Sequence, residues 1–266
     1  MDNKIIGFIG GGNMTLAIAS GLLGSGYPPE SLCIAEPHAE QRERLAAILP
    51  GVDLTTDNAV IAANVDCLVL ATKPQVLAGV CRELACAVQE RKPLIVSIAA
   101  GIRGADIDAW LGGGLSIVRV MPNQPALLQR GASGLFANEL TSNDERELAS
   151  EILTAVGEVV WVKSEADIDA VTAVSGSGPA YFFLLIDMLA KTAVELGLDQ
   201  EAGLQLAVQT AVGAAQMAAQ TEDSMDALIA RVRSPGGTTA AALDLSLIHI
   251  SEPTRHICLS RMPSSA

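Results

Sequence analysis

The chain has 266 residues, a length that suits two domains of ordinary size. Its formal net charge is -13 and its basic residues form no cluster, so nucleic acids and anionic membranes are disfavoured as partners. No uninterrupted apolar run reaches the roughly 20 residues that cross a bilayer, and the first residues lack the pattern of a secretion signal. We therefore expect a cytoplasmic protein that binds neither nucleic acid nor membrane.

The first 163 residues alternate short apolar runs with helical or turn-rich segments. A run at residues 4–9 leads into a glycine-rich turn and then a helix with apolar periodicity at residues 16–23. A helix is also expected at residues 144–156. The pattern is typical of an α/β fold with a Rossmann-type, doubly wound sheet. The other expected strands lie at residues 32–35, 52–54, 67–71, 94–98, 116–120, 132–138 and 158–162, the last two extending the sheet edge.

Strand patterns end near residue 164, and an all-α domain is expected at residues 164–244. Its first three helices are expected at residues 166–174, 180–196 and 201–220. Ser177 has the position of an N-cap for the second of these, Pro179 lies in its first turn, and Gly197 marks its end. Small residues allow these helices to pack closely, either within a core or across a dimer interface.

Residues 245–266 break the helical pattern. Residues 245–255 and 260–266 resemble a translated sequencing adapter, and residues 256–259 lie where a variable index would be. We therefore expect a non-native tail, a truncated helical domain and weakened oligomerisation. An unusual natural C-terminus is the alternative.

The cysteines and histidines indicate no metal site and no nucleophilic triad. Five cysteines are scattered without the spacing of metal ligands, and we interpret them as reduced, mostly buried side chains. The only histidines are His38, His249 and His256. With so few histidines, a catalytic Ser-His or Cys-His pair has almost no candidate base.

The glycine-rich turn has the features of a dinucleotide site. Gly10 and Gly12 allow a tight turn after the first strand and let a pyrophosphate approach the start of the helix, where Asn13 and Met14 follow. Thr15 stands where the pattern usually has Gly or Ala. A glycine turn with a purely structural role is the alternative.

Glu36 lies at the end of the next strand, about 20 residues beyond the turn, where a carboxylate binds ribose hydroxyls. A carboxylate there favours NAD because it repels the 2'-phosphate of NADP. His38, Arg42 and Arg44 follow closely and are candidates to bind that phosphate, although the arginines also fit a solvated helix face. The sequence leaves the choice between NADP and NAD open.

Three further segments follow strands at the edge where open α/β sheets bind ligands. Lys73 is a candidate to contact a phosphate or ribose of the cofactor, or it simply reaches solvent. Asn123 is a candidate to hydrogen-bond the carboxamide of the cofactor or the substrate, but its loop also fits a plain turn. The cofactor-binding candidates at this edge are Ala71, Lys73, Pro74, Ala99, Gly101 and Asn123.

Six motifs together resemble pyrroline-5-carboxylate reductases, in order and spacing, from residue 4 to about residue 243. The departures are Thr15, Gln124 where the family usually has Thr, and the tail. The motifs are GFIGGGNM at 7–14, KPQ at 73–75, SIAAG at 97–101, MPN at 121–123, VSGSGPAY at 174–181 and SPGGTT at 234–239.

The resemblance implies an enzyme in which NAD(P)H donates a hydride to the C=N carbon of 1-pyrroline-5-carboxylate, without a histidine base. It implies that Ser234, Gly237, Thr238 and Thr239 hold the substrate carboxylate and ring nitrogen, and that Thr239 bonds the nitrogen. It also places Ser175 in the substrate site. Finally, it implies a homodimer or larger assembly.

Two other functions remain open on the residues alone. A hydroxyacid dehydrogenase of the same architecture would need a lysine acid on a helix of the second domain, where Lys191 is the candidate, but an ion pair with nearby Glu195 explains this lysine better. A catalytically silent dinucleotide sensor would not require the hydroxyl-lined loop at residues 234–239.

Overall fold

The computed structural model of the protein describes residues 4–249. The chain forms two compact units, with the division between Pro179 and Ala180. We describe each unit separately.

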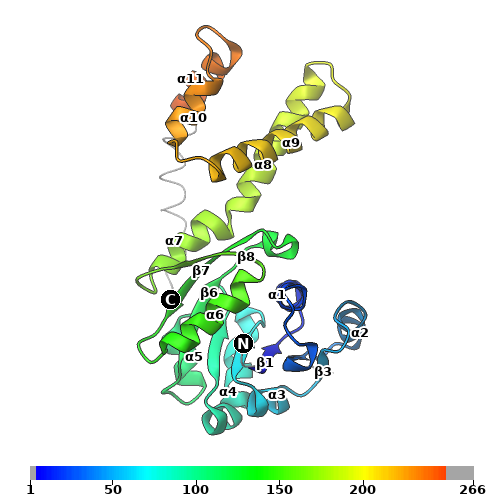
Figure 1. The fold of residues 1–266 in the computed structure, drawn as a ribbon, viewed down its shortest axis with the longest axis vertical. Helices are drawn as coiled ribbons and strands as arrows, with labels where there is room; N and C mark the ends of the chain where they lie inside the picture. The colour runs from blue at the N-terminus through cyan, green and yellow to red at the C-terminus, as the bar shows by residue number, and fades with distance from the viewer. Residues whose placement is uncertain (1–3, 250–266) are drawn as a thin grey trace. The chain divides into compact units, whose positions relative to one another are not determined.

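An eight-stranded sheet forms the centre of the first unit, in the order β3-β2-β1-β4-β5-β6-β7-β8 (Figure 1). The first six strands are parallel, β7 is antiparallel to β6, and β8 is parallel to β7. This arrangement confirms the predicted Rossmann-type sheet, with its last two strands extending one edge. The strands are β1 (Ile6–Ile9), β2 (Leu32–Ala35), β3 (Asp53–Thr55), β4 (Cys67–Leu70), β5 (Leu94–Ser97), β6 (Ile117–Met121), β7 (Gly131–Ala137) and β8 (Gly157–Trp161).

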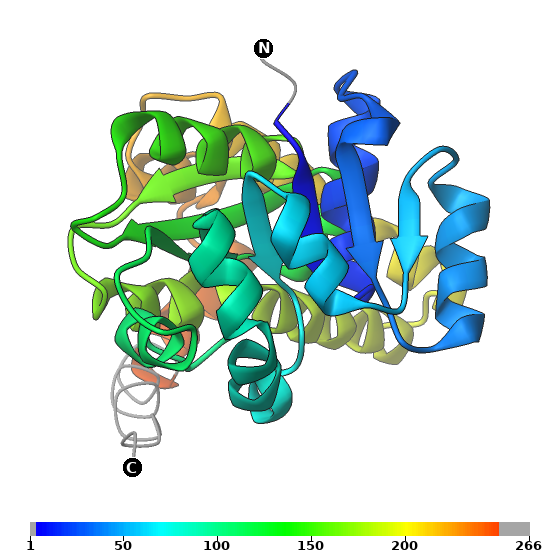
Figure 2. The same cartoon turned by 90° about the horizontal axis from the view of Figure 1, so that it is seen from below.

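Helices cover both faces of the sheet (Figure 2). On one face, α1 (Asn13–Gly24), α2 (Ala39–Ile48) and α6 (Asn143–Thr154) contribute to one buried apolar cluster. On the other face, α3 (Asn58–Asn64), α4 (Pro74–Arg91) and α5 (Gly104–Trp110) contribute to a second. Burial on both faces explains why the central strands are continuous apolar runs instead of alternating patterns. Two short 3-10 helices lie in the loops of this unit. η1 (Pro29–Ser31) precedes β2, and η2 (Gln124–Leu128) lies between β6 and β7.

The segment after β8 lies in the first compact unit, which ends at Pro179. The domain boundary expected at residue 164 stays a prediction. This segment forms α7 (Asp167–Val171) and the π-helical turn η3 (Thr172–Gly176). α7 packs closely on the sheet, since a Cβ atom on Gly134 of β7 would lie 2.5 Å from the Val171 side chain. This close packing explains why residues 164–179 belong to the first unit.

The expected N-cap at Ser177 is wrong. Ser177 has a helical backbone, with φ -87° and ψ -22°, and its N–H donates to the Thr172 carbonyl at 2.8 Å. The helical stretch therefore extends from Asp167 to Glu195, through η3, a bend at Ser177 and α8 (Gly178–Glu195). The glycine and serine cluster is a local widening of this helix and not a break in it.

The second unit is helical, as predicted. Gly197, with φ +99°, follows the end of α8, and the Asp199 side chain caps α9 (Gln200–Ala219). α10 (Met225–Val232) and α11 (Thr238–His249) follow. α11 continues past residue 244, so the expected boundary of the tail is not the end of a helix. The rest of that predicted tail, residues 250–266, lies outside the described residues.

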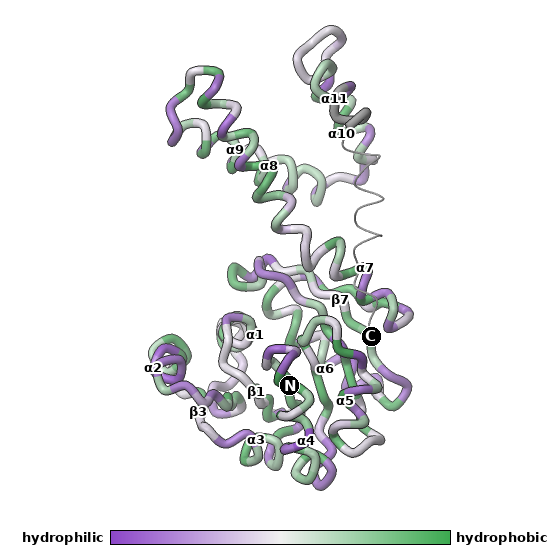
Figure 3. The backbone as a smooth tube through the Cα atoms, turned by 180° about the vertical axis from the view of Figure 1, so that it is seen from behind, coloured by the Kyte–Doolittle hydropathy of each residue, from purple (hydrophilic) through white to green (hydrophobic). Residues whose placement is uncertain are grey.

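Large apolar side chains are exposed along α8 and α9. Hydrophobic residues recur along both helices, as the colouring of Figure 3 shows. Within residues 4–249, the stretch Asp167–Glu195 is long and apolar enough to cross a membrane by length and composition alone, which the sequence analysis did not anticipate. It contains the ion pair of Asp187 and Lys191. The exposed apolar residues include Tyr181, Phe182, Phe183, Leu184, Leu185 and Met188 on α8, and Leu204, Leu206, Val212 and Met217 on α9.

Candidate active site

The glycine-rich turn leaves open space at the start of α1. Gly10 has φ +103°, and a Cβ atom there would lie 2.9 Å from the Ala71 carbonyl oxygen, so the chain itself requires glycine. Gly12, the N-cap of α1, differs because a Cβ atom there would meet nothing within 4 Å. The structure does not need glycine at position 12 for its own packing. A helix N-terminus with this open approach fits the pyrophosphate of a dinucleotide.

Thr15 replaces the usual small residue of the pattern without loosening the turn. Its side chain is fully buried, and its hydroxyl donates to the Gly10 carbonyl at 2.7 Å. The hydroxyl therefore adds a hydrogen bond between the start of α1 and the glycine turn. The adjacent Met14 is half-buried against the core cluster that includes α1.

Glu36 is tied to the glycine turn. Its side chain is only 7% exposed, and its Oε2 accepts the N–H of Gly11 at 2.9 Å. Its Oε1 accepts the N–H of His38, also at 2.9 Å. A carboxylate has further lone pairs for a ribose hydroxyl. Glu36 thus shapes the turn in addition to the role predicted for it.

The two candidate arginines have different partners. Arg42 donates from Nη1 to the carbonyls of Glu36 and Pro37, both at 2.8 Å, so it fastens the loop after β2. Arg44 is exposed, and its Nη1 donates to the Asn13 side chain at 3.3 Å. Arg44 and Asn13 therefore lie together at the exposed mouth of the glycine turn, whereas Arg42 is engaged by the backbone.

The candidates after β4 and β5 reach the same sheet edge as the turn. Ile9, Leu70 and Ser97 are register partners at the ends of β1, β4 and β5. Ala71 directly follows β4, and its N–H donates to the Ile9 carbonyl at 2.9 Å. Lys73 is exposed just before Pro74, which begins α4. After β5, Ala99 is buried, whereas Gly101 has φ +74° and open space around it.

A residue that the sequence analysis missed lies at this edge. Within the described residues, Thr72 has a buried hydroxyl with no hydrogen-bond partner. A Cβ atom on Gly10 would lie 3.4 Å from the Thr72 side chain, which places Thr72 beside the glycine turn. A buried polar atom of this kind costs free energy unless a partner satisfies it. This orphaned hydroxyl and the open space at Gly12 are consistent with a bound dinucleotide.

Both ends of the Asn123 side-chain amide already have hydrogen-bond partners within the protein. Its side chain is 8% exposed, and its Oδ1 accepts the N–H of Ala132 at 2.9 Å. Its Nδ2 donates to the carbonyl of Ser175 at 3.0 Å. This hydrogen bond links Asn123, which was predicted to bind the cofactor, to Ser175, which was predicted to bind the substrate. The Ser175 hydroxyl donates back to the Val171 carbonyl at 3.1 Å.

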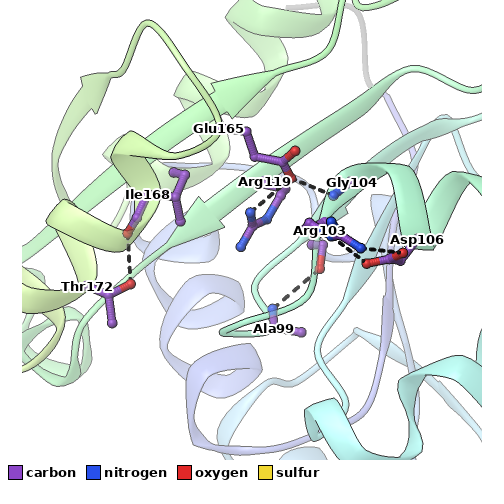
Figure 4. Close-up of polar contacts among 9 residues, drawn as sticks. Ala99, Arg103, Gly104, Asp106, Arg119, Glu165, Ile168 and Thr172 are labelled. Carbon is purple, nitrogen blue, oxygen red and sulfur yellow. Dashed lines mark hydrogen bonds and ion pairs between the residues drawn. The ribbon is translucent and has the colours of Figure 1, made fainter. Parts of the chain in front are cut away.

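An ion pair between a buried arginine and a partly exposed glutamate lies near the start of α5 (Figure 4). Arg119 of β6 donates to Glu165 Oε1 at 2.9 Å, and the same oxygen accepts the N–H of Gly104 at 2.6 Å. Figure 4 also shows Ala99, which lies in the loop that leads to Gly104. No sequence pattern predicts this contact, because its three members are far apart in the chain.

The substrate-binding candidates 234–239 form a loop in the second unit. The N–H of Gly237 donates to the Ser234 carbonyl at 3.0 Å, and Thr238 and Thr239 begin α11. The loop borders an open hollow of about 540 Å³, which is lined by Gly237 but not by Ser234, Thr238 or Thr239. Arg233, which the sequence analysis did not single out, also lines this hollow and pairs with Asp244 at 3.0 Å.

Lys191 does not have the partner that we expected. Its Nζ lies 2.7 Å from Asp187 Oδ2, one turn toward the N-terminus, instead of pairing with Glu195. Both side chains of the pair are largely exposed, so the ion pair is a surface contact of α8. This arrangement gives no support to a lysine acid.

Two family models match the chain. Residues 165–246 match "Pyrroline-5-carboxylate reductase dimerisation", and residues 5–101 match "NADP oxidoreductase coenzyme F420-dependent". A pyrroline-5-carboxylate reductase from Pseudomonas aeruginosa is 48% identical over 243 residues, which cover 91% of this chain and 88% of the relative.

Two solved structures share the fold along nearly the whole chain. A pyrroline-5-carboxylate reductase from Coxiella burnetii has a TM-score of 0.89 at 42% identity, covering 97% of this chain and 94% of the other. The Plasmodium falciparum pyrroline carboxylate reductase with NADP bound has a TM-score of 0.85 at 27% identity, covering 98% and 95%. The identity to the Pseudomonas relative and the coverage of both chains establish that this chain belongs to the pyrroline-5-carboxylate reductase family.

Proposed function

We propose that the protein reduces 1-pyrroline-5-carboxylate to L-proline with NAD(P)H, the last step of proline biosynthesis. The observation that carries the proposal is the 48% identity over 91% of the chain to a relative of that name. The open start of α1 and the hydroxyl-lined loop at residues 234–239 supply the two kinds of binding surface that the reaction needs. The enzyme is expected to act in the cytoplasm.

The first unit is assigned the dinucleotide. Gly12 leaves the start of α1 open to a pyrophosphate, and Thr72 offers a buried hydroxyl beside it. When bound, the reduced nicotinamide supplies a hydride to the imine carbon. The remaining contacts are assigned to residues of the glycine turn and the neighbouring strand ends, namely Gly10, Asn13, Met14, Ala71, Lys73, Pro74, Ala99 and Gly101.

The loop of the second unit is assigned the substrate. Ser234, Gly237 and Thr238 offer hydroxyl and backbone N–H donors for the carboxylate of the imine. The Thr239 hydroxyl is assigned to the ring nitrogen, where it orients the C=N bond for attack. Protonation of this nitrogen makes the neighbouring carbon electrophilic, so the reaction needs no histidine base.

Either NADP or NAD fits this assignment, and we propose that NADPH is preferred. Glu36 already accepts the backbone N–H groups of Gly11 and His38, and each of its oxygens keeps a lone pair for a ribose hydroxyl of either cofactor. Arg44 stays exposed beside Asn13 at the turn, where a guanidinium can pair with a 2'-phosphate.

The protein is also proposed to form a homodimer or a larger assembly of identical subunits. The dimerisation model matches residues 165–246, and the exposed apolar residues of α8 and α9 form a surface that favours burial against a partner. A second copy of the chain is the occupant that the family match supports.

The decisive assay is the consumption of each reduced dinucleotide with racemic 1-pyrroline-5-carboxylate. We expect NADPH oxidation to depend on the imine and to form proline. Oxidation of a hydroxyacid with NADP, without imine reduction, would support a dehydrogenase instead. Tight dinucleotide binding without turnover of either substrate would support a sensor.

A further inference from the structure

The helix that leaves the first unit contains a proline where a backbone donor is expected. Pro179 lies inside the helical stretch Asp167–Glu195. Since proline has no N–H, the carbonyl of Ser175, four residues earlier, lacks its regular helical donor. The side chain of Asn123 donates to this carbonyl at 3.0 Å. An amide from the loop after β6 thus supplies the hydrogen bond that the proline cannot make.

The helix is widened at the same place. The N–H of Ser177 donates to the carbonyl of Thr172, five residues earlier, at 2.8 Å. Gly176 faces the end of β6 closely, because a Cβ atom there would lie 2.7 Å from the Met121 side chain. Turns of this π-helical type inside α-helices occur frequently at functional sites.

The other end of the Asn123 side chain is fixed as well. Its Oδ1 accepts the N–H of Ala132 in β7 at 2.9 Å, and the side chain is only 8% exposed. A buried amide held at both ends has little rotational freedom. The Asn123 side chain therefore holds the Ser175 carbonyl at a fixed position relative to the sheet.

We propose that Asn123 is a positioning residue of the reductase, which holds η3 in its π-helical geometry and so places Ser175 for the substrate. This inference rests on the proposed function, in which Ser175 belongs to the substrate site. It differs from the expected role of Asn123 as a ligand contact. Asn123 acts through the helix backbone, because it supplies to the Ser175 carbonyl the donor that Pro179 lacks.

The test begins with Asn123→Asp. This substitution keeps the oxygen that accepts from Ala132 but replaces the donor to Ser175 by a second oxygen. We expect kcat for imine reduction to fall by about tenfold to a hundredfold, because small displacements of site residues cost rate strongly. The Kd for NADPH should stay unchanged, since the glycine turn lies on other elements. Amide hydrogen exchange in the peptide covering residues 172–180 should become faster.

The rescue variant is Asn123→Asp combined with Pro179→Ala. Alanine restores an N–H at position 179, which can donate to the Ser175 carbonyl. The double variant should recover much of the lost kcat and the slow exchange, although Pro179→Ala alone should not raise kcat. A loss that the double variant fails to recover would overturn the proposal.

Asn138→Asp is the matched control. Asn138 also bridges backbone groups, since its Nδ2 donates to Leu115 O at 2.8 Å and its Oδ1 accepts from Ile117 N–H at 3.1 Å. It lies at the opposite end of β6, so its loss should lower stability without the selective fall in kcat. An equal fall in kcat for both variants would show that Asn123 has only a structural role.

The exchange measurement separates this proposal from the proposed function. If the wild-type protein does not reduce the imine, the proposed function fails. Faster exchange in Asn123→Asp, recovered in the double variant, would then still show that the amide holds the turn. Altered exchange with an unchanged kcat in an active enzyme would overturn the positioning role.

Discussion

Arg119 and Glu165 form an ion pair in which only one partner is fully withdrawn from water. The Arg119 side chain is 6% exposed, whereas that of Glu165 is 29% exposed. Their N–O distance is 2.9 Å, and the same carboxylate oxygen accepts the N–H of Gly104 (Figure 4). The pair therefore links β6, the segment before α7 and the start of α5.

This asymmetry predicts unequal effects of removing the two partners. Glu165→Leu leaves a buried cation without a counter-charge and should cost about 3 to 5 kcal/mol of unfolding free energy. Arg119→Leu should cost less, because Glu165 can turn toward solvent and an apolar side chain suits the buried site. Urea unfolding of both variants and of the double variant measures this. Equal losses would contradict the prediction, as would a double variant less stable than Glu165→Leu.

Gly12→Val is expected to abolish dinucleotide binding while leaving the fold nearly intact. The added Cβ atom meets nothing within 4 Å in the protein, and the branched side chain is expected to fill the approach to α1. Gly10→Val is the contrasting variant, because its φ of +103° and the Ala71 carbonyl leave no room. It should lose about 1 to 3 kcal/mol or more of stability. Titration with NADPH and NADH, together with thermal melts, distinguishes the two. Unchanged affinity in Gly12→Val would refute the placement of the dinucleotide.

Removing the charge of Glu36 should shift selectivity toward NADPH. Glu36→Gln retains an oxygen for the Gly11 N–H, so the turn should survive. We expect the ratio of kcat/KM values to move toward NADPH by about tenfold, equivalent to about 1.4 kcal/mol. Glu36→Ser should show the same direction but weaker binding of both cofactors, because it also loses the contact to Gly11. A shift toward NADH in either variant would remove Glu36 from the selectivity role.

Thr239→Ala should lower kcat more than it weakens cofactor binding. Its hydroxyl is assigned to the substrate nitrogen, and losing one well-placed donor commonly costs about a hundredfold or more in rate. Thr210→Ala in α9 is a suitable control, because its hydroxyl only donates to the Leu206 carbonyl. Steady-state kinetics at saturating NADPH measure the effect. Wild-type turnover of Thr239→Ala would leave Thr239 with only a structural role at the start of α11.

Two thiols, the partly buried Cys33 and the buried Cys81, predict a loss of stability at high pH. Burial raises the pKa of Cys33 and of Cys81 to about 11. The folded state therefore keeps these protons after the unfolded chain has lost them, near pH 9. Their contribution to stability is complete below pH 9 and is lost as the pH rises through 11. Cys33→Ala should flatten this decline, whereas replacing the exposed Cys86 should not. Denaturant unfolding across this pH range tests both.

Periodicity predicts the first unit well because buried parallel strands are continuous apolar runs. Residues 32–35 form β2 as expected, and the glycine turn lies between β1 and α1. The prediction fails at Ser177, because a serine followed by a proline indicates a helix start from local preferences alone. The donor to the Ser175 carbonyl comes from Asn123, which is distant in the chain. Thr72 was missed for a related reason, since its burial without a partner depends on neighbouring strands.

The two outer strands of the sheet influence how the protein behaves at high concentration. β3 has only three residues and begins with the exposed Asp53, and β8 carries the exposed Glu158. Short edge strands with charged residues resist pairing with the strands of another molecule. Precipitation during refolding should therefore arise from the apolar surfaces of α8 and α9 and not from the growth of intermolecular sheets.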